Sequence, residues 1–130
     1  MSDFGKSLEI SASGMRAQSS RLRMVSENLA NVDTPGYRRK MSSFEQVFDD
    51  SGETALVRKG KTRLDQSELP KIYDPSHVLA GSDGYFEGSN VNLMIEIADA
   101  REAQRSYDAN LKMFEQARKM STALLDLLRR

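Results

Sequence analysis

Few side chains in this sequence could support catalysis. His77 is the one histidine, and it lies beside Asp74 and Ser76. A Ser-His-Asp hydrolase needs these three residue types, with the histidine as general base. Neighbours in a proline-containing turn do not thereby form a triad, and a single loop histidine is most often a polar surface residue. Asp99 and Glu102 fall on a charged helix face, where we expect water to solvate them. We therefore predict that the protein is not an enzyme.

The sequence also lacks the usual ligands of metals and cofactors. It contains no cysteine, which excludes disulfides, thiolate zinc sites and a cysteine nucleophile. A single histidine makes no ligand cluster. We predict neither a metal nor a cofactor.

Composition limits the classes of partner. The 130 residues correspond to one domain, with 19 basic and 19 acidic residues and a net charge of zero. A nucleic acid or an acidic membrane surface would favour a basic patch, so neither is predicted. We expect no transmembrane span, because no stretch has about eighteen uninterrupted apolar residues. Residues 1–15 lack the apolar core of a signal peptide. Composition alone would place the protein in the cytoplasm.

Residues 26–39 mark the end of a long helical pattern. Pro35 cannot continue a helix, and it moves Thr34 out of the α region. Pro35 and Gly36 suit the two central positions of a type II turn, in which glycine accepts a positive φ. We expect the helix to end near residues 31–33. Asn28 and Asn31 lie on one face of its last turn, where amides satisfy carbonyls that lose their helical partners.

Apolar periodicity predicts two long helices, at residues 4–32 and from residue 90 almost to the end. Asn90 or Ser89 is the predicted N-cap of the second helix. Between them we expect short strands at residues 55–58, 71–73 and 85–86. The apolar side chains expected to be available for burial there are Phe44, Val47 and Phe48.

The apolar stripes predict which side chains line the two helices. The first helix carries Phe4, Leu8, Met15, Leu22, Val25, Leu29 and Val32. The second carries Leu93, Ile97, Ala100, Tyr107, Leu111, Phe114, Ser121, Leu125 and Leu128, flanked by Ala103, Ala117 and Leu124.

We predict a mainly α fold, in which the two terminal helices form an antiparallel hairpin or coiled coil around a small, irregular, β-containing middle segment. The expected divisions are residues 1–36, 37–89 and 90–130. About fifty loop-rich residues cannot cover two such helices, so their apolar stripes must bury against each other or against other chains. We therefore expect the hairpin to complete its burial by assembling.

The string Ser26-Glu27-Asn28-Leu29-Ala30-Asn31-Val32-Asp33-Thr34-Pro35-Gly36-Tyr37-Arg38 resembles the N-terminal signature of the bacterial flagellar axial proteins, which include rod, hook and hook-associated proteins. That signature runs roughly Ser-x-Asn-x-Ala-Asn-x-x-Thr-x-Gly-Tyr-Lys/Arg, and this chain fills each of its places.

The second half resembles the proximal-rod proteins of this family. The matching strings are Tyr73-Asp74-Pro75-Ser76-His77, Gly84-Tyr85, Asn90-Val91-Asn92-Leu93 and Arg105-Ser106-Tyr107-Asp108-Ala109-Asn110. Val78 and Ser89 stand where prolines are usual, which affects loop stiffness and not the helices. A sister proximal-rod protein is the alternative, although it usually lacks the Tyr-x-Ala-Asn string and the histidine-bearing loop.

The resemblance implies a structural subunit of the flagellar basal-body rod. Such subunits stack helically with copies of themselves and with other rod proteins, enclose the export channel and transmit torque from the membrane ring to the hook. It also implies a periplasmic location at the membrane-ring/rod junction, reached through the flagellar export apparatus without a cleaved signal. This overrules the cytoplasmic location that composition suggests. The expected assembly residues are Leu22, Val25, Asn28, Leu29, Asn31, Thr34, Pro35, Gly36, Tyr37, Tyr107, Asn110, Leu111 and Phe114.

A small coiled-coil adaptor or secretion chaperone is a more remote alternative, because it too would show apolar helical stripes. The Asn-x-x-Thr-Pro-Gly-Tyr turn speaks against it, since a chaperone needs no such fixed exit from its helix.

Overall fold

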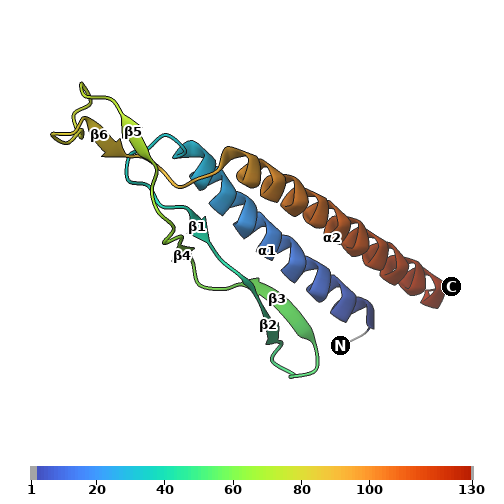
Figure 1. The fold of residues 1–130 in the computed structure, drawn as a ribbon. Helices are drawn as coiled ribbons and strands as arrows, with labels where there is room; N and C mark the ends of the chain where they lie inside the picture. Colours follow the sequence, from blue (N-terminus) through green and yellow to red (C-terminus); the bar gives the residue numbers. More distant parts are fainter. Residues whose placement is uncertain (1–2, 130) are drawn as a thin grey trace.

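The computed structural model describes residues 3–129. Two helices dominate it, α1 (Asp3–Ala30) and α2 (Leu93–Leu128). They lie side by side and run in opposite directions (Figure 1). At 1.5 Å per residue, α1 is about 42 Å long and α2 about 54 Å. The predicted mainly α fold with a helical hairpin is confirmed. Neither helix in the described part of the chain is long and apolar enough to cross a membrane.

The middle segment forms three small antiparallel sheets, two of them beside α1 and the third, the last along the chain, beyond the end of the helices where α1 stops and α2 begins (Figure 1). They pair β1 (Lys40–Met41) with β4 (Arg63–Leu64), β2 (Phe44–Phe48) with β3 (Ala55–Lys59), and β5 (Lys71–Tyr73) with β6 (Tyr85–Glu87). The predicted strands correspond to β3, β5 and β6. The sequence analysis missed β1, β2 and β4, of which β1 and β4 are only two residues long.

Phe44 and Phe48, which the sequence analysis expected to be available for burial, remain uncovered in the single chain. Both side chains are exposed, Phe48 by 60%. Alternate residues of a strand point to opposite faces, so Phe44 and Phe48 share one face of β2 and Val47 lies on the other. The neighbouring strand β3 packs against α1, and the backbone N–H of Val57 donates to Ser13 Oγ at 3.3 Å. Val47 is half-buried.

Small side chains that the stripe analysis placed only at its flanks or left out are, with the predicted Val25, the most buried apolar positions of the two helices. Ala103 is fully buried and Ala117 nearly so, whereas Leu125 and Leu128 are mostly exposed. On α1 the fully buried positions include Gly14 and Ala17. The correction has a steric reason, because small residues let two helices approach closely and large ones are displaced to the sides of the contact. The predicted stripe positions Leu8, Met15, Leu22, Leu29, Tyr107 and Phe114 are half-buried.

The N-cap of α2 is Asn92, so the prediction of Asn90 or Ser89 is wrong. The Asn92 side chain accepts hydrogen bonds from the backbone N–H groups of Met94 and Ile95 at 3.0 and 3.3 Å. Asn90 is engaged elsewhere, since its carbonyl oxygen accepts from the backbone N–H of Arg39 at 2.7 Å. Asn90 and Asn92 are equally able to cap a helix, and the tertiary contact of Asn90 leaves Asn92 as the N-cap.

Gly14 generates the first testable prediction. A Cβ at this position would lie 2.6 Å from Asn110 Oδ1. Gly14→Val must displace the Asn110 side chain, which donates to the backbone oxygen of Ser106, or move α1 away from α2. Overpacking of this kind lowers the free energy of unfolding by about 1–3 kcal/mol. Urea denaturation followed by circular dichroism measures the change.

The matched control is Ser19→Val, which introduces the same side chain at an exposed position of the same helix. Its effect should remain within about 0.5 kcal/mol. Equal losses in the two variants would refute close helix approach as the cause.

Candidate assembly interface

The chain leaves α1 through a turn fixed by its own side chains. Asn31 Nδ2 donates to the backbone oxygen of Glu27 at 2.8 Å, and Thr34 Oγ1 donates to Asn31 Oδ1 at 3.0 Å. The backbone N–H of Tyr37 donates to the oxygen of Thr34 at 3.2 Å, and Gly36 has φ +75°. This confirms the predicted turn with Pro35 and Gly36 at its centre. Asn31 satisfies a helix-end carbonyl as predicted.

Asn28 has a different role from the predicted one. It is fully buried, and its Oδ1 accepts from the Tyr37 hydroxyl and from the backbone N–H of Lys40, each at 2.9 Å. Its Nδ2 donates to the backbone oxygen of Lys40 at 3.0 Å and to Glu96 Oε2 at 3.3 Å. The Asn28 amide thus pairs with both the N–H and the C=O of Lys40, as the backbone of a neighbouring β-strand does. It therefore joins α1 to the outgoing chain and to α2, rather than closing its own helix.

The carboxylate of Glu96 is the centre of this arrangement. Its side chain is fully buried, and it pairs with Asn28 through Oε2 and with Arg39 Nε through Oε1. Arg39 Nη2 also donates to Asp99 Oδ2 at 2.9 Å, and Arg21 reaches Asp99 Oδ1 at 3.3 Å. Burial opposes the charge of Arg39, but the hydrogen bond and charge of Glu96, together with Asp99, raise the arginine pKa above its usual value. We call Asn28, Tyr37, Arg39, Glu96 and Asp99 the polar network.

Further hydrogen bonds attach the middle segment to the polar network. The amide Nδ2 of Asn90 donates to the backbone oxygen of Asp65 at 3.0 Å, while its Oδ1 holds the backbone of Arg39. Arg38 Nη1 donates to the backbone oxygens of Asp65 and Ser67 at 3.1 and 2.9 Å. Residues 38–40 are thereby fixed between the two helices and the β-containing segment.

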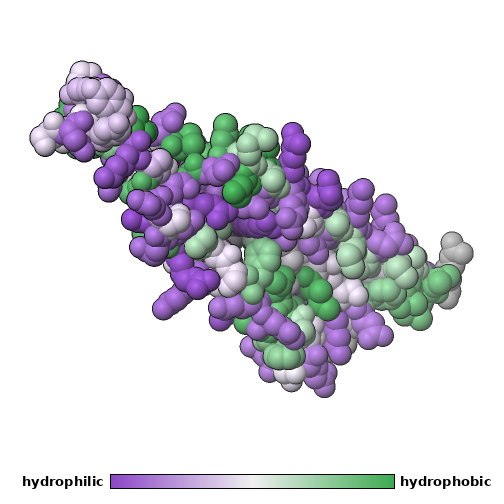
Figure 2. All heavy atoms as spheres, in the orientation of Figure 1, coloured by the Kyte–Doolittle hydropathy of each residue, from purple (hydrophilic) through white to green (hydrophobic). Residues whose placement is uncertain are grey.

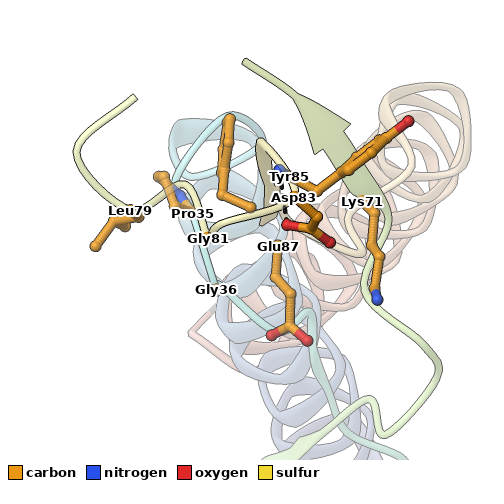
Figure 3. A pocket seen from close by; sticks show the side chains of 9 residues that line it. Pro35, Gly36, Lys71, Leu79, Gly81, Asp83, Tyr85 and Glu87 are labelled. Atoms are coloured by element: carbon orange, nitrogen blue, oxygen red, sulfur yellow. Dashed lines mark hydrogen bonds between the residues drawn. The ribbon is translucent and has the colours of Figure 1, made fainter. Parts of the chain in front are cut away.

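A shallow cleft lies where the exit turn meets the β5–β6 hairpin (Figure 3). The backbone N–H of Gly36 donates to the oxygen of Glu87 at 3.1 Å, which joins the turn to β6. Lys71, Asp83 and Glu87 give the cleft charges of both signs. The contacts of the cleft orient the β5–β6 pair relative to α1. Its surface is open and carries both charged and apolar groups, so it favours no particular ligand.

The side chains considered for catalysis do not form a proton relay. Ser76 Oγ donates to Asp74 Oδ1 at 2.7 Å, while His77 Nδ1 accepts from the backbone N–H of Leu79 at 3.1 Å. The His77 ring stacks on Phe86 with a centroid distance of 3.9 Å. These residues shape a loop. Among residues 3–129, no group of three or more histidine, cysteine or acidic side chains is placed to hold a metal ion.

The predicted assembly residues divide into two groups. Val25 and Asn28 are buried within the chain, so they are inaccessible to a partner in this conformation. The others are half-buried or exposed. Half-buried are Leu22, Leu29, Asn31, Pro35, Tyr37, Tyr107, Asn110 and Phe114; exposed are Thr34, Gly36 and Leu111.

Large apolar side chains remain uncovered at both ends of α2. Leu93, Met94 and Ile95 are exposed at its start, and Leu124, Leu125, Leu127 and Leu128 are exposed at its end. Figure 2 shows hydrophobic atoms gathered over the C-terminal end of α2. A single chain in water gains from covering such surface, so these ends are the strongest candidates for contact with other chains.

Sequence reasoning missed Arg39 and Glu96 as a pair. A signal existed, because Glu96 stands next to Ile97 within an otherwise apolar turn of helix. Which cation it pairs with could not be inferred, since Arg39 lies 57 positions away.

Glu96 generates the second prediction. Glu96→Gln leaves Arg39 partly buried with Asp99 as its remaining carboxylate, so the free energy of unfolding should fall by about 3 kcal/mol. Urea denaturation measures it. Glu102→Gln is the control, because the Glu102 side chain is 69% exposed and its ion pair with Arg21 is worth less than about 1 kcal/mol. A loss no larger than the control's would show that the polar network contributes little.

Two family models match the ends of the chain that carry this arrangement. The model described as "Flagella basal body rod protein" matches residues 8–38, and the model described as "Flagellar basal body rod FlgEFG protein C-terminal" matches residues 82–127. The first match contains Asn28 and the exit turn, and the second contains Asn90 and Glu96.

Similar proteins match almost end to end. The chain is 42% identical to the flagellar basal-body rod protein FlgC of Agrobacterium fabrum, over 93% of this chain and 92% of the relative. It is 32% identical to the FlgC of Bacillus subtilis, over 93% of this chain and 95% of the relative, and 37% identical to that of Aquifex aeolicus, over 88% and 89%. The sister rod protein FlgB is not better supported. The chain therefore belongs to the FlgC family of flagellar basal-body rod proteins.

Proposed function

We propose that this chain, a structural subunit of the flagellar basal-body rod, assembles helically with copies of itself and with other rod proteins. The observation that carries the proposal is the uncovered apolar surface at both ends of α2. Each large apolar side chain removed from water contributes about 1.5–3 kcal/mol, so contact between subunits is strongly favoured. An interface between two different surfaces of the same chain repeats without closing and builds a filament.

The helical hairpin suits the inner wall of such a filament. In our proposal α1 and α2 surround the export channel, and the β-containing middle segment lies further out. The polar network supports this arrangement, because it holds the middle segment at a fixed angle to the helices. A stiff connection of this kind passes torque from the membrane ring towards the hook. The subunit works in the periplasm, at the membrane-ring/rod junction, and reaches it through the flagellar export apparatus without a cleaved signal.

The assembly residues keep distinct parts in this proposal. Leu22, Leu29 and Leu111, with Tyr107 and Phe114, contact neighbouring subunits through the parts of their side chains that the hairpin leaves open. Asn31 and Asn110 set register beside them. Val25 and Asn28 act from inside the subunit by keeping it in the assembling conformation. The exit turn, which is formed by Thr34, Pro35, Gly36 and Tyr37, directs the middle segment.

Deletion of the gene tests the proposal directly. Cells without the chain should assemble basal bodies that lack a rod, and cryo-electron microscopy of complemented cells should show density for the chain inside the rod. Rods of normal length in the deletion strain, or no density for the chain, would refute it.

Gly36 supplies a variant that separates assembly from folding. A Cβ at this position would meet no atom within 4 Å, so the strain of a substitution comes mainly from φ +75°. Val strongly disfavours that conformation, at a cost of about 1–2 kcal/mol, whereas Asn tolerates it. Gly36→Val should therefore abolish swimming in soft agar while the purified chain stays soluble.

The control variant Gly36→Asn should swim. Full motility of a strain carrying only Gly36→Val would contradict the role assigned to the turn. Insoluble protein would mean that the turn serves folding rather than assembly.

A further inference from the structure

An apolar groove runs along the side of the hairpin near its open end. Its walls come from the first turns of α1 and from residues 112–120 of α2, and they include Phe4, Ile10, Lys112, Met113, Ala117 and Met120. Ile10, Met113 and Met120 are all at least 44% exposed. The hairpin leaves this groove unfilled along about two turns of each helix.

Within residues 3–129, the apolar C-terminal end of α2 extends beyond α1. The described start of α1 lies well short of the C-terminal end of α2, and no other element of residues 3–129 runs beside that end (Figure 1). We call residues 121–128 the helix tail. Its four leucines, at positions 124, 125, 127 and 128, are 46–75% exposed. At about 100° per residue they cover an arc of about 160°, with Asp126 on the opposite side.

The stripe of the helix tail continues an interface that already exists. Ala103 and Ala117 pack against α1, and positions 124 and 128 follow at helical spacing on the same face of α2. Beyond the described N-terminal start of α1, that face of α2 no longer packs against α1. The helix tail therefore has the pattern of a surface made to pack against another helix pair.

The helix tail cannot fill the groove of its own chain. The groove wall and the helix tail are consecutive parts of one helix, and α2 runs from Leu93 to Leu128 without glycine or proline. A straight helix cannot fold back on itself, so the occupant must come from another molecule.

We propose that the helix tail of one copy lies in the groove of a second copy that is displaced along the hairpin axis. This inference rests on the proposed assembly of the rod and names the contact that makes it. The groove ends where the helix tail begins, so a shift of about nine residues, or about 13 Å, brings the two together in a parallel orientation. Each copy then offers one helix tail and one groove, and the contact repeats without closing.

Cysteine cross-linking tests the contact cleanly, because the sequence has no cysteine. The nine-residue shift places Leu125 of one copy beside Gln116 of the next. A chain carrying both Gln116→Cys and Leu125→Cys should form disulfides between successive copies in isolated basal bodies, since the bond requires Cα atoms within about 7 Å. Non-reducing gels should show a ladder of dimers, trimers and longer species.

Two controls define the result. Each single cysteine variant should lose the ladder, and so should Gln104→Cys combined with Leu125→Cys, because Gln104 is exposed on α2 outside the groove. Rods that contain the doubly substituted chain but give no ladder would overturn the contact and leave the proposed function intact. A further strain carries Leu125→Cys in this chain and the second cysteine in a different rod subunit. A disulfide between those two proteins would show that the helix tail binds that subunit and not a second copy of this chain.

A measurement on the purified chain keeps the inference testable if the cysteine variants fail to assemble. Sedimentation should show self-association that rises with concentration and disappears in Leu125→Asp. Glu115→Gln, a charge change on an exposed part of α2 outside the groove, should leave it unchanged. A chain that stays monomeric at every concentration, or self-association that Leu125→Asp leaves intact, would overturn the contact. Absence of the chain from rods would refute the proposed function separately.

Discussion

The structure depends on one buried carboxylate. Glu96 has no access to water, and an isolated charge in that position would be strongly unfavourable. Asn28 and Arg39 compensate it, one from the last turn of α1 and the other from the chain that has just left that helix. Three segments therefore have to meet at one point for the charge to be satisfied. Because the network loses most of its value if one member is displaced, it selects a single orientation of the middle segment.

The helix contact and the free surfaces complement each other. Small residues such as Gly14 and Ala103 let α1 and α2 approach closely, which moves larger side chains to the flanks of the hairpin. A protein that had to be stable alone would bury its leucines. Here Leu124, Leu125 and Leu127 remain in water in the single chain. That distribution is expected for a subunit whose burial is completed by neighbours.

Rigidity and exposure together serve a rod subunit. The polar network and the exit turn tie the middle segment to both helices. In the proposed rod, this connection would pass force from the middle segment to the helices. In the proposed assembly, the uncovered ends of α2 would be the surfaces that neighbouring subunits cover. Charge balance fits this use, because a chain with 19 basic and 19 acidic residues adds little net repulsion when many copies pack side by side.

The sequence by itself determined the elements whose signals are local. Periodicity located both long helices, and the Pro35–Gly36 pair defined the turn, because helix propensity and positive φ are properties of a few neighbouring residues. Flanking turn residues were enough to locate β3, β5 and β6. The antiparallel hairpin followed from the two apolar stripes and the short segment between them.

Tertiary structure decided what depends on partners far apart in the chain. The choice of Asn92 over Asn90 as N-cap followed from the bond between Asn90 and the backbone of Arg39. The pairing of Glu96 with Arg39 and the exposure of Phe48 could not be predicted, since each depends on where a distant segment packs. The stripe analysis named Ala103 and Ala117 only as flanking positions and did not name Gly14, yet all three are buried in the hairpin. Helical spacing gives the face of a helix, but only the approach of the second helix decides which residues on that face are buried.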